Sequence, residues 1–137
     1  AERVNEKIAT AFDFQLTNMI TGRDRQSGME AIDKVEKEME KYEFPSKSRL
    51  KMFVEIARAQ KSGDVEKLLQ VCEKNIPQIE HEYLLAMFFP LSLTIKRNGN
   101  EGQQQRILKL AKTLLAETTN NKFKFSLGQF IPYALEK

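Results

Sequence analysis

Apolar residues recur at the three- and four-residue intervals of an amphipathic helix along most of the chain. Ile8, Phe12 and Met19 form the first such stripe and predict a helix over residues 2–20 that breaks at Gly22. Four further stripes lie at residues 32–42, 50–57, 65–76 and 107–115. Charged residues occupy most of the positions between them, so each helix is expected to bury one face and expose the other.

Turn and capping residues separate these stripes. Pro45 is expected to end the second helix, and Ser46 is a suitable N-cap for the third, which is expected to end at Gly63. The segment NGNEG at residues 98–102 has the composition of a turn. Connections of only a few residues favour pairs of antiparallel helices.

The stretch YLLAMFFPLSLTI, residues 83–95, is almost wholly apolar. A membrane-spanning helix needs about 20 apolar residues, and Glu82 and Lys96 close this run at its two ends, so it is too short to cross a bilayer. We therefore expect other helices to bury it. It is the central part of a predicted fifth helix over residues 79–96.

A proline interrupts this predicted fifth helix. In the interior of an exposed straight helix Pro90 would cost ~3 kcal/mol, because it lacks an N–H donor and its ring clashes with the preceding turn. We therefore predict a kink at this position. The carbonyl freed near Ala86 is expected to bond to Ser92, Thr94 or water.

The last segment, KFKFSLGQFIPYALEK, carries two conflicting patterns. Phe123, Phe125 and Leu127 alternate with polar residues as in a strand, whereas Phe130 and Leu135 belong to a helical stripe. A lone strand would have no partner for its backbone hydrogen bonds. The segment is therefore predicted to be a helix.

Composition favours the same fold class. Six glycines and four prolines in 137 residues are few for a chain of many strands and turns, and 41% hydrophobic residues are enough for a folded core. The length fits one domain, so we predict a single all-α domain over residues 1–137.

The helices also suggest an internal repeat. The second, fourth and sixth helices each follow a glycine-bearing turn, and Ile32, Leu68 and Ile107 hold equivalent places in them. The offsets between these residues are 36 and 39, the size of a helical-hairpin repeat.

The segment AQKSGDVEKLLQVCEKNIP resembles the turn between the paired helices of tetratricopeptide repeats. The residues that carry the resemblance are Gly63, Asp64, Glu66, Lys67 and Leu68. The likeness is clearest over residues 46–77, although Leu68 and Asn75 stand where the family favours alanine and Ile56 stands where it favours glycine. The resemblance implies about three antiparallel hairpins in a right-handed stack, followed by a C-terminal helix, and it brings no catalytic residue.

Charge is unevenly distributed along the chain. Residues 93–137 contain eight basic and three acidic residues, whereas the chain as a whole has a formal charge of +3. Arg106, Lys109 and Lys112 lie on one side of the predicted sixth helix and are the candidates for facing an anion. An ordinary solvated face explains them more simply. Nucleic acid is not the favoured partner, because a helix-turn-helix at KSGDVEKLLQVC would have too few basic residues in its second helix for DNA recognition.

The sequence carries no catalytic or metal-binding motif. Cys72 lies on the apolar stripe of the fourth helix, so a buried thiol is favoured over a reactive one. His81 stands between Glu80 and Glu82 without a second histidine, which favours a solvated or capping role over metal binding. We therefore predict no catalytic residue, no metal and no cofactor.

The aromatic residues near the C-terminus are the candidate interaction surface. Phe123, Phe125, Phe130 and Tyr133 project to more than one side of any helix, so packing on one neighbour leaves some of them uncovered. The surface is expected to take a protein or peptide partner, an adjacent domain or a second copy of the chain.

Three functions fit these features. The favoured one is a non-catalytic protein-interaction or scaffold module that binds on a concave face or an open end of the stack. The second is an accessory helical domain of a larger, exported enzyme or regulator, for example beside a thioredoxin-like domain. The third is binding of a polyanion or nucleic acid through the basic residues 93–137. The chain opens on Ala1, so its cellular compartment stays open.

Overall fold

Every regular element in the described part of the protein is helical. The computed structural model describes residues 2–24 and 26–137, with side chains from residue 5 onward, and no strand lies in this part of the chain. The α-helices are α1 (Glu2–Thr21), α2 (Met29–Met39), α3 (Lys47–Ser62), α4 (Val65–Asn75), α5 (His81–Leu84), α6 (Phe88–Asn98), α7 (Glu101–Glu117) and α8 (Asn121–Phe130). A 3₁₀ turn, η1 (Ile76–Gln78), follows α4, and a π-helical turn, η2 (Ile131–Leu135), follows α8. The predicted all-α fold class is confirmed.

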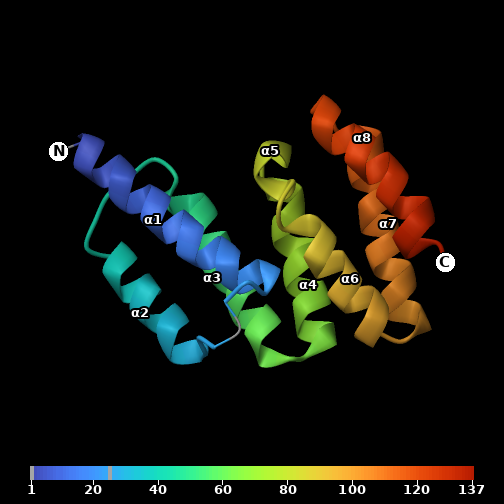
Figure 1. Cartoon of the computed structure of the whole chain (residues 1–137), viewed down its shortest axis with the longest axis horizontal. Coiled ribbons are helices and arrows are strands. Elements are labelled where there is room, and N and C mark those ends of the chain that lie inside the picture. Colours follow the sequence, from blue (N-terminus) through green and yellow to red (C-terminus); the bar gives the residue numbers. More distant parts are fainter. Residues whose placement is uncertain (1, 25) are drawn as a thin grey trace. The chain divides into compact units, whose positions relative to one another are not determined.

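The contacts within the chain divide it into two compact units, one ending at Gly63 and the other beginning at Asp64. In the first unit, α1 and α2 both pack on α3, and α2 runs antiparallel to the other two helices (Figure 1). The core of this unit contains fully buried side chains from all three helices, among them Leu16, Ile32 and Phe53. The amphipathic stripes of the sequence therefore face one another, as their spacing requires.

Glycine and aspartate set the helix boundaries at the junction of α3 and α4. Gly63 ends α3 in the left-handed conformation with φ of 72°, which a residue without a Cβ adopts readily. The Asp64 carboxylate then caps α4 by accepting a hydrogen bond from the backbone N–H of Lys67 at 3.2 Å. Ser46 stands at the predicted N-cap of α3, but its side chain makes no capping hydrogen bond.

In the second unit, α4, α6, α7 and α8 alternate in direction (Figure 1). Helices α6 and α7 form a tight hairpin whose turn needs glycine, because a Cβ at Gly99 would lie 2.6 Å from the carbonyl oxygen of Ile95. A reciprocal capping box begins α7. The Asn100 side chain accepts from the backbone N–H of Gln103 at 2.8 Å, and the Gln103 side chain accepts from that of Asn100 at 2.9 Å.

The prediction of one continuous fifth helix over residues 79–96 is wrong, and the prediction of a kink within it at Pro90 is wrong as well. The chain forms the short α5, a turn at residues 85–87 and then α6, so Pro90 lies in the first turn of α6. The first backbone N–H that bonds within α6 belongs to Leu91, which donates to Met87 at 3.2 Å. Proline at this place removes no hydrogen bond.

The hydroxyls near Pro90 also differ from expectation. Ser92 donates to the carbonyl of Phe88 at 2.7 Å and Thr94 to that of Pro90 at 3.0 Å, so neither bonds near Ala86. The burial inferred for the apolar stretch is confirmed at Phe88, Leu91 and Ile95, which have no exposed surface.

The region that most resembles a tetratricopeptide repeat crosses the boundary between the two units. Its turn has the left-handed glycine and the aspartate cap described above. The predicted single domain and the stack of hairpins stay predictions.

Across the described residues, no helix combines the length and apolarity that crossing a membrane requires.

Candidate interaction surface

The C-terminal aromatic segment is a helix, as predicted, and one side of it joins the core of the second unit. Asn120 caps α8 by accepting from the backbone N–H of Phe123 at 3.0 Å. Phe123, Leu127, Ile131 and Leu135 are all buried, four residues apart. Leu135 stays on the buried side through the wider turn of η2.

Phe123 is a core residue, which corrects its assignment to the interaction surface. It is fully buried, and its ring centroid lies 6.2 Å from that of Phe88 and 6.3 Å from that of Phe89, both in α6. The ring of His81 lies on the same phenylalanine, 5.2 Å between centroids. These contacts tie α8 to α5 and α6.

The other predicted aromatics remain at the surface. Phe125 is 68% exposed and Tyr133 is 74% exposed. Phe130 is half-buried and meets the ring of Phe89 edge-to-face, with 4.7 Å between centroids. The edge-to-face geometry is a favourable arrangement for two aromatic rings, so this contact stabilises the positions of Phe89 and Phe130.

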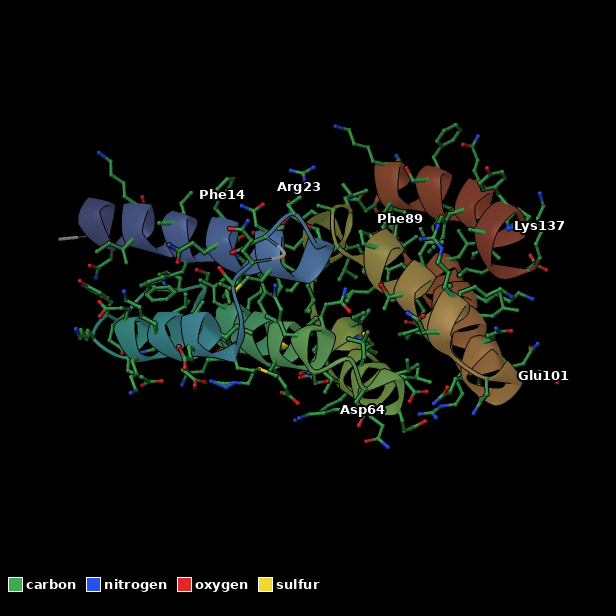
Figure 2. The ribbon with its side chains drawn as sticks, turned by 60° about the horizontal axis from the view of Figure 1, so that its bottom comes forward. Phe14, Arg23, Asp64, Phe89, Glu101 and Lys137 are labelled. Atoms are coloured by element: carbon green, nitrogen blue, oxygen red, sulfur yellow. The ribbon has the colours of Figure 1, made fainter. Side chains whose placement is uncertain are left out.

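These aromatics border an open groove. Its lining residues come from α6, α8 and η2 and are Phe89, Ser126, Gln129, Phe130 and Tyr133. We call this feature the aromatic groove. Figure 2 shows Phe89 at the start of α6, on the side where α8 passes. Phe125 lies one helical turn before Gln129 and extends the apolar surface beyond the groove.

Phe89 is a groove residue that the sequence interpretation missed. It was grouped with the buried stretch of residues 83–95. A signal was present, since neighbouring residues on a helix point about 100° apart, so Phe88 and Phe89 cannot be buried to the same extent by a single neighbouring helix. Which of the two faces outward depends on where α8 packs.

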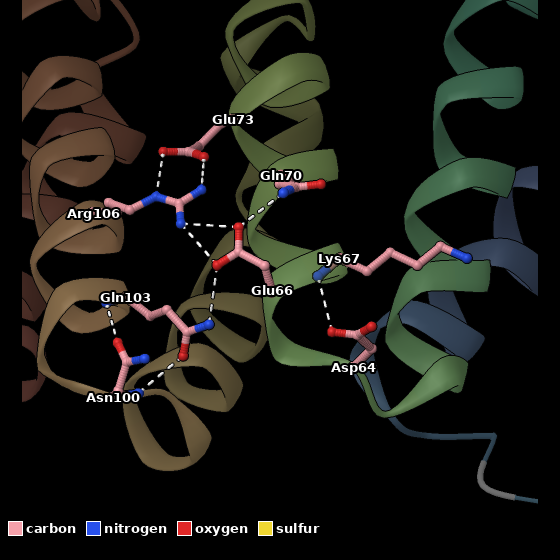
Figure 3. Close-up of polar contacts among 8 residues, drawn as sticks. All are labelled: Asp64, Glu66, Lys67, Gln70, Glu73, Asn100, Gln103 and Arg106. Atoms are coloured by element: carbon pink, nitrogen blue, oxygen red, sulfur yellow. Dashed lines mark hydrogen bonds and ion pairs between the residues drawn. The ribbon is translucent and has the colours of Figure 1, made fainter.

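Arg106 is bound by carboxylates of its own chain (Figure 3). Its guanidinium nitrogens lie 2.8 and 3.0 Å from the Glu66 oxygens and 2.5 and 3.3 Å from the Glu73 oxygens, across the contact of α7 with α4. Such forked pairing is the strongest form of arginine–carboxylate contact. Hydrogen bonds from Gln103, and then from Arg106, lower the pKa of Glu66.

The candidate anion-facing residues are therefore not equivalent. Two carboxylates compensate the charge of Arg106 within the second unit. Lys109 and Lys112 are exposed on α7, and the Lys112 ammonium lies 3.9 Å from a carboxylate oxygen of Glu136. The three residues do not form one open cationic row.

Cys72 and His81, the two side chains considered for reactivity or metal binding, both pack against other residues of the chain. Cys72 is fully buried, and burial raises the pKa of its thiol to about 12, which confirms the expected buried cysteine. His81 is half-buried: its Nδ1 lies 2.6 Å from the Thr118 hydroxyl and its ring packs on Phe123. Among the described residues, no cluster of histidine, cysteine and carboxylate side chains is arranged to hold a metal ion.

Comparison with protein-family models, with curated proteins and with solved structures finds no match for this chain. Its function is therefore inferred from the geometry of its own residues.

Proposed function

We propose that this chain is a non-catalytic protein-interaction module that binds a protein or peptide partner at the aromatic groove. The observation that carries the proposal is the exposure of Tyr133 and Phe125, at 74% and 68%, beside a groove floored by Phe89 and Phe130. Single exposed apolar residues are ordinary on a protein surface, but a contiguous group marks an interaction site.

The chemistry of the groove suits protein recognition. Tyrosine and phenylalanine bury large areas and are enriched in protein interfaces, and tyrosine is also enriched among the residues that dominate binding energy. Ser126 and Gln129 line the same groove and offer hydrogen bonds to a partner's polar groups. An apolar floor with a few polar groups is the usual composition of a binding cleft.

The resemblance to tetratricopeptide repeats supports the same proposal. The left-handed Gly63 and the Asp64 cap match the turn that carries the resemblance. Arrays of such helical hairpins present extended surfaces for binding. In this proposal, the partner docks where α6 and α8 leave their aromatic side chains uncovered.

Selection from a library of displayed helical peptides tests the proposal. We expect selected peptides to bind the intact chain at least about tenfold more tightly than a Phe125→Ser, Tyr133→Ser variant, because the variant loses the exposed anchors. Phe14→Ser is the matched control, since Phe14 is 66% exposed on α1, outside the second unit.

Circular dichroism should show that the three proteins retain the same helix content. Selected peptides that bind the Phe125→Ser, Tyr133→Ser variant as tightly as the intact chain would contradict the proposal.

A further inference from the structure

The aromatic groove follows the axis of α8 and η2. Ser126, Gln129 and Tyr133 line it at intervals of three and four residues, so they mark one side of the helix over roughly 10 Å. Phe89 and Phe130 complete the floor. A partner helix that presents apolar side chains at positions i, i+3 or i+4 and i+7 matches such a surface in length and in chemistry.

The residues that line the aromatic groove are uncharged, but lysines lie at its ends and along its α6 side. Lys122 is exposed one turn before Ser126 on α8. The ammonium of Lys137 lies 4.9 Å from the centre of the Tyr133 ring, at the other end. Lys96 follows Phe89 by seven residues and so lies on the same face of α6.

The acidic residue nearest in sequence to this lysine group is directed elsewhere. Glu136 lies between Leu135 and Lys137, and its carboxylate pairs with Lys112 of α7. The lysines around the groove thus present positive charge to a partner that lies in it. Opposite charges on the two surfaces steer association and select among partners.

We infer that the partner segment is an acidic amphipathic helix, an inference that rests on the function proposed above. Its apolar face contacts Phe89, Phe130 and Tyr133, and its flanking glutamates or aspartates approach Lys96, Lys122 and Lys137.

Single-stranded nucleic acid is the less favoured occupant. Its bases would need open ring faces on which to stack. The Lys137 ammonium covers one face of Tyr133, and the Phe89 and Phe130 rings meet edge-to-face within the floor.

Three fluorescent helical peptides of identical apolar pattern test the inference, with flanking positions of glutamate, glutamine or lysine. Fluorescence anisotropy should show the glutamate peptide binding at least about tenfold more tightly than the lysine peptide at low salt, with the difference shrinking as salt rises. Lys122→Glu, Lys137→Glu should abolish or reverse this preference. Lys34→Glu, Lys37→Glu is the matched control in the first unit and should leave it unchanged, because both lysines are exposed on α2.

The outcomes separate this inference from the proposed function. Equal binding of all three peptides, lost in Tyr133→Ser, would overturn the acidic partner and leave an interaction module. Absence of binding by any peptide, or binding that Tyr133→Ser does not weaken, would overturn both.

Two further results would replace the inferred partner. A single-stranded oligonucleotide that binds more tightly than the glutamate peptide, and competes with it, would make the occupant a nucleic acid. A homodimer in light scattering that Tyr133→Ser converts to monomer would make it a second copy of the chain.

Discussion

At the scale of single residues, neighbouring aromatics have opposite environments. Phe123 is fully buried and Phe125 is 68% exposed, because two positions along a helix place side chains about 200° apart, on opposite faces. Their alternation with Leu127, which resembles a strand in the sequence, fits a helix with Phe123 and Leu127 inside and Phe125 outside. The exposed member of each such pair is the one available to a partner.

Cys72 should be inert in the folded protein. Burial raises the pKa of the thiol from 9.0 to about 12, so at pH 8 the native state holds almost no thiolate. We expect iodoacetamide to alkylate Cys72 only as fast as the protein opens, as followed by mass spectrometry. Because the folded state holds this proton more tightly than the unfolded state, the free energy of unfolding should keep its full value below pH 9.0. It should then fall as the pH rises toward about 12. Alkylation in native buffer at the rate found in urea would contradict the assignment.

Glu66 should report on the polar contacts of α7 with α4. Its pKa is lowered first by the hydrogen bond from Gln103 and then by that from Arg106. Gln103→Ala and Arg106→Gln should each raise it, as measured by carboxyl-carbon NMR titration, while Lys109→Gln should not. Since the folded pKa is depressed, the stabilisation is present above the ordinary value of 4.5 and is lost as pH falls through the lowered value. An unchanged Glu66 titration in both variants would show that the contacts are absent in solution.

At the scale of elements, the segment around Pro90 shows how the first turn of a helix accepts a proline. The continuous apolar run of residues 83–95 has little contrast between faces, so its pattern does not mark where α5 ends and α6 begins. In the folded chain Pro90 lies where backbone N–H groups have no helical partner.

Proline substitutions should distinguish the first turn of α6 from its interior. Pro90→Ala is expected to change the free energy of unfolding by less than about 1 kcal/mol, because no hydrogen bond is gained within the helix. Thr94→Pro should cost ~3 kcal/mol or more, since it removes an internal N–H donor and clashes with the preceding turn. Urea denaturation measures both, with Thr94→Ala controlling for the lost hydroxyl contact. If Pro90→Ala raised the free energy of unfolding by several kcal/mol, the result would instead support a strained, kinked helix at Pro90.

At the scale of the whole molecule, two compact units share one chain. Each has its own buried phenylalanine, Phe53 in the first unit and Phe123 in the second. The sequence predicts a single domain, and cooperativity of unfolding is the property that tests this.

A cavity in one unit should be felt most strongly within that unit. Phe53→Ala is expected to cost about 3 to 5 kcal/mol and to accelerate amide hydrogen exchange throughout residues 2–24 and 26–63, with a smaller effect in residues 64–137. Phe14→Ala, an exposed phenylalanine in the same unit, should change exchange little. Equal acceleration along the whole chain would establish one cooperative domain.

The sequence by itself determined the fold class and the approximate positions of most helices in this protein. Periodic apolar residues and the glycine at the end of α3 are local signals, and their physics needs no distant partner. The burial of Cys72 follows from the same periodicity.

Tertiary structure alone decided the site. Phe89 and Phe123 belong to helices far apart in sequence, and which ring is covered depends on the packing of α8 on its neighbours. Likewise, the sequence identifies Arg106 as a basic residue but does not show that its charge is compensated. The compensation arises because α4 places Glu66 and Glu73 beside it. Exposure and pairing are properties of contacts between distant segments, and a linear pattern of residue types does not encode which segments meet.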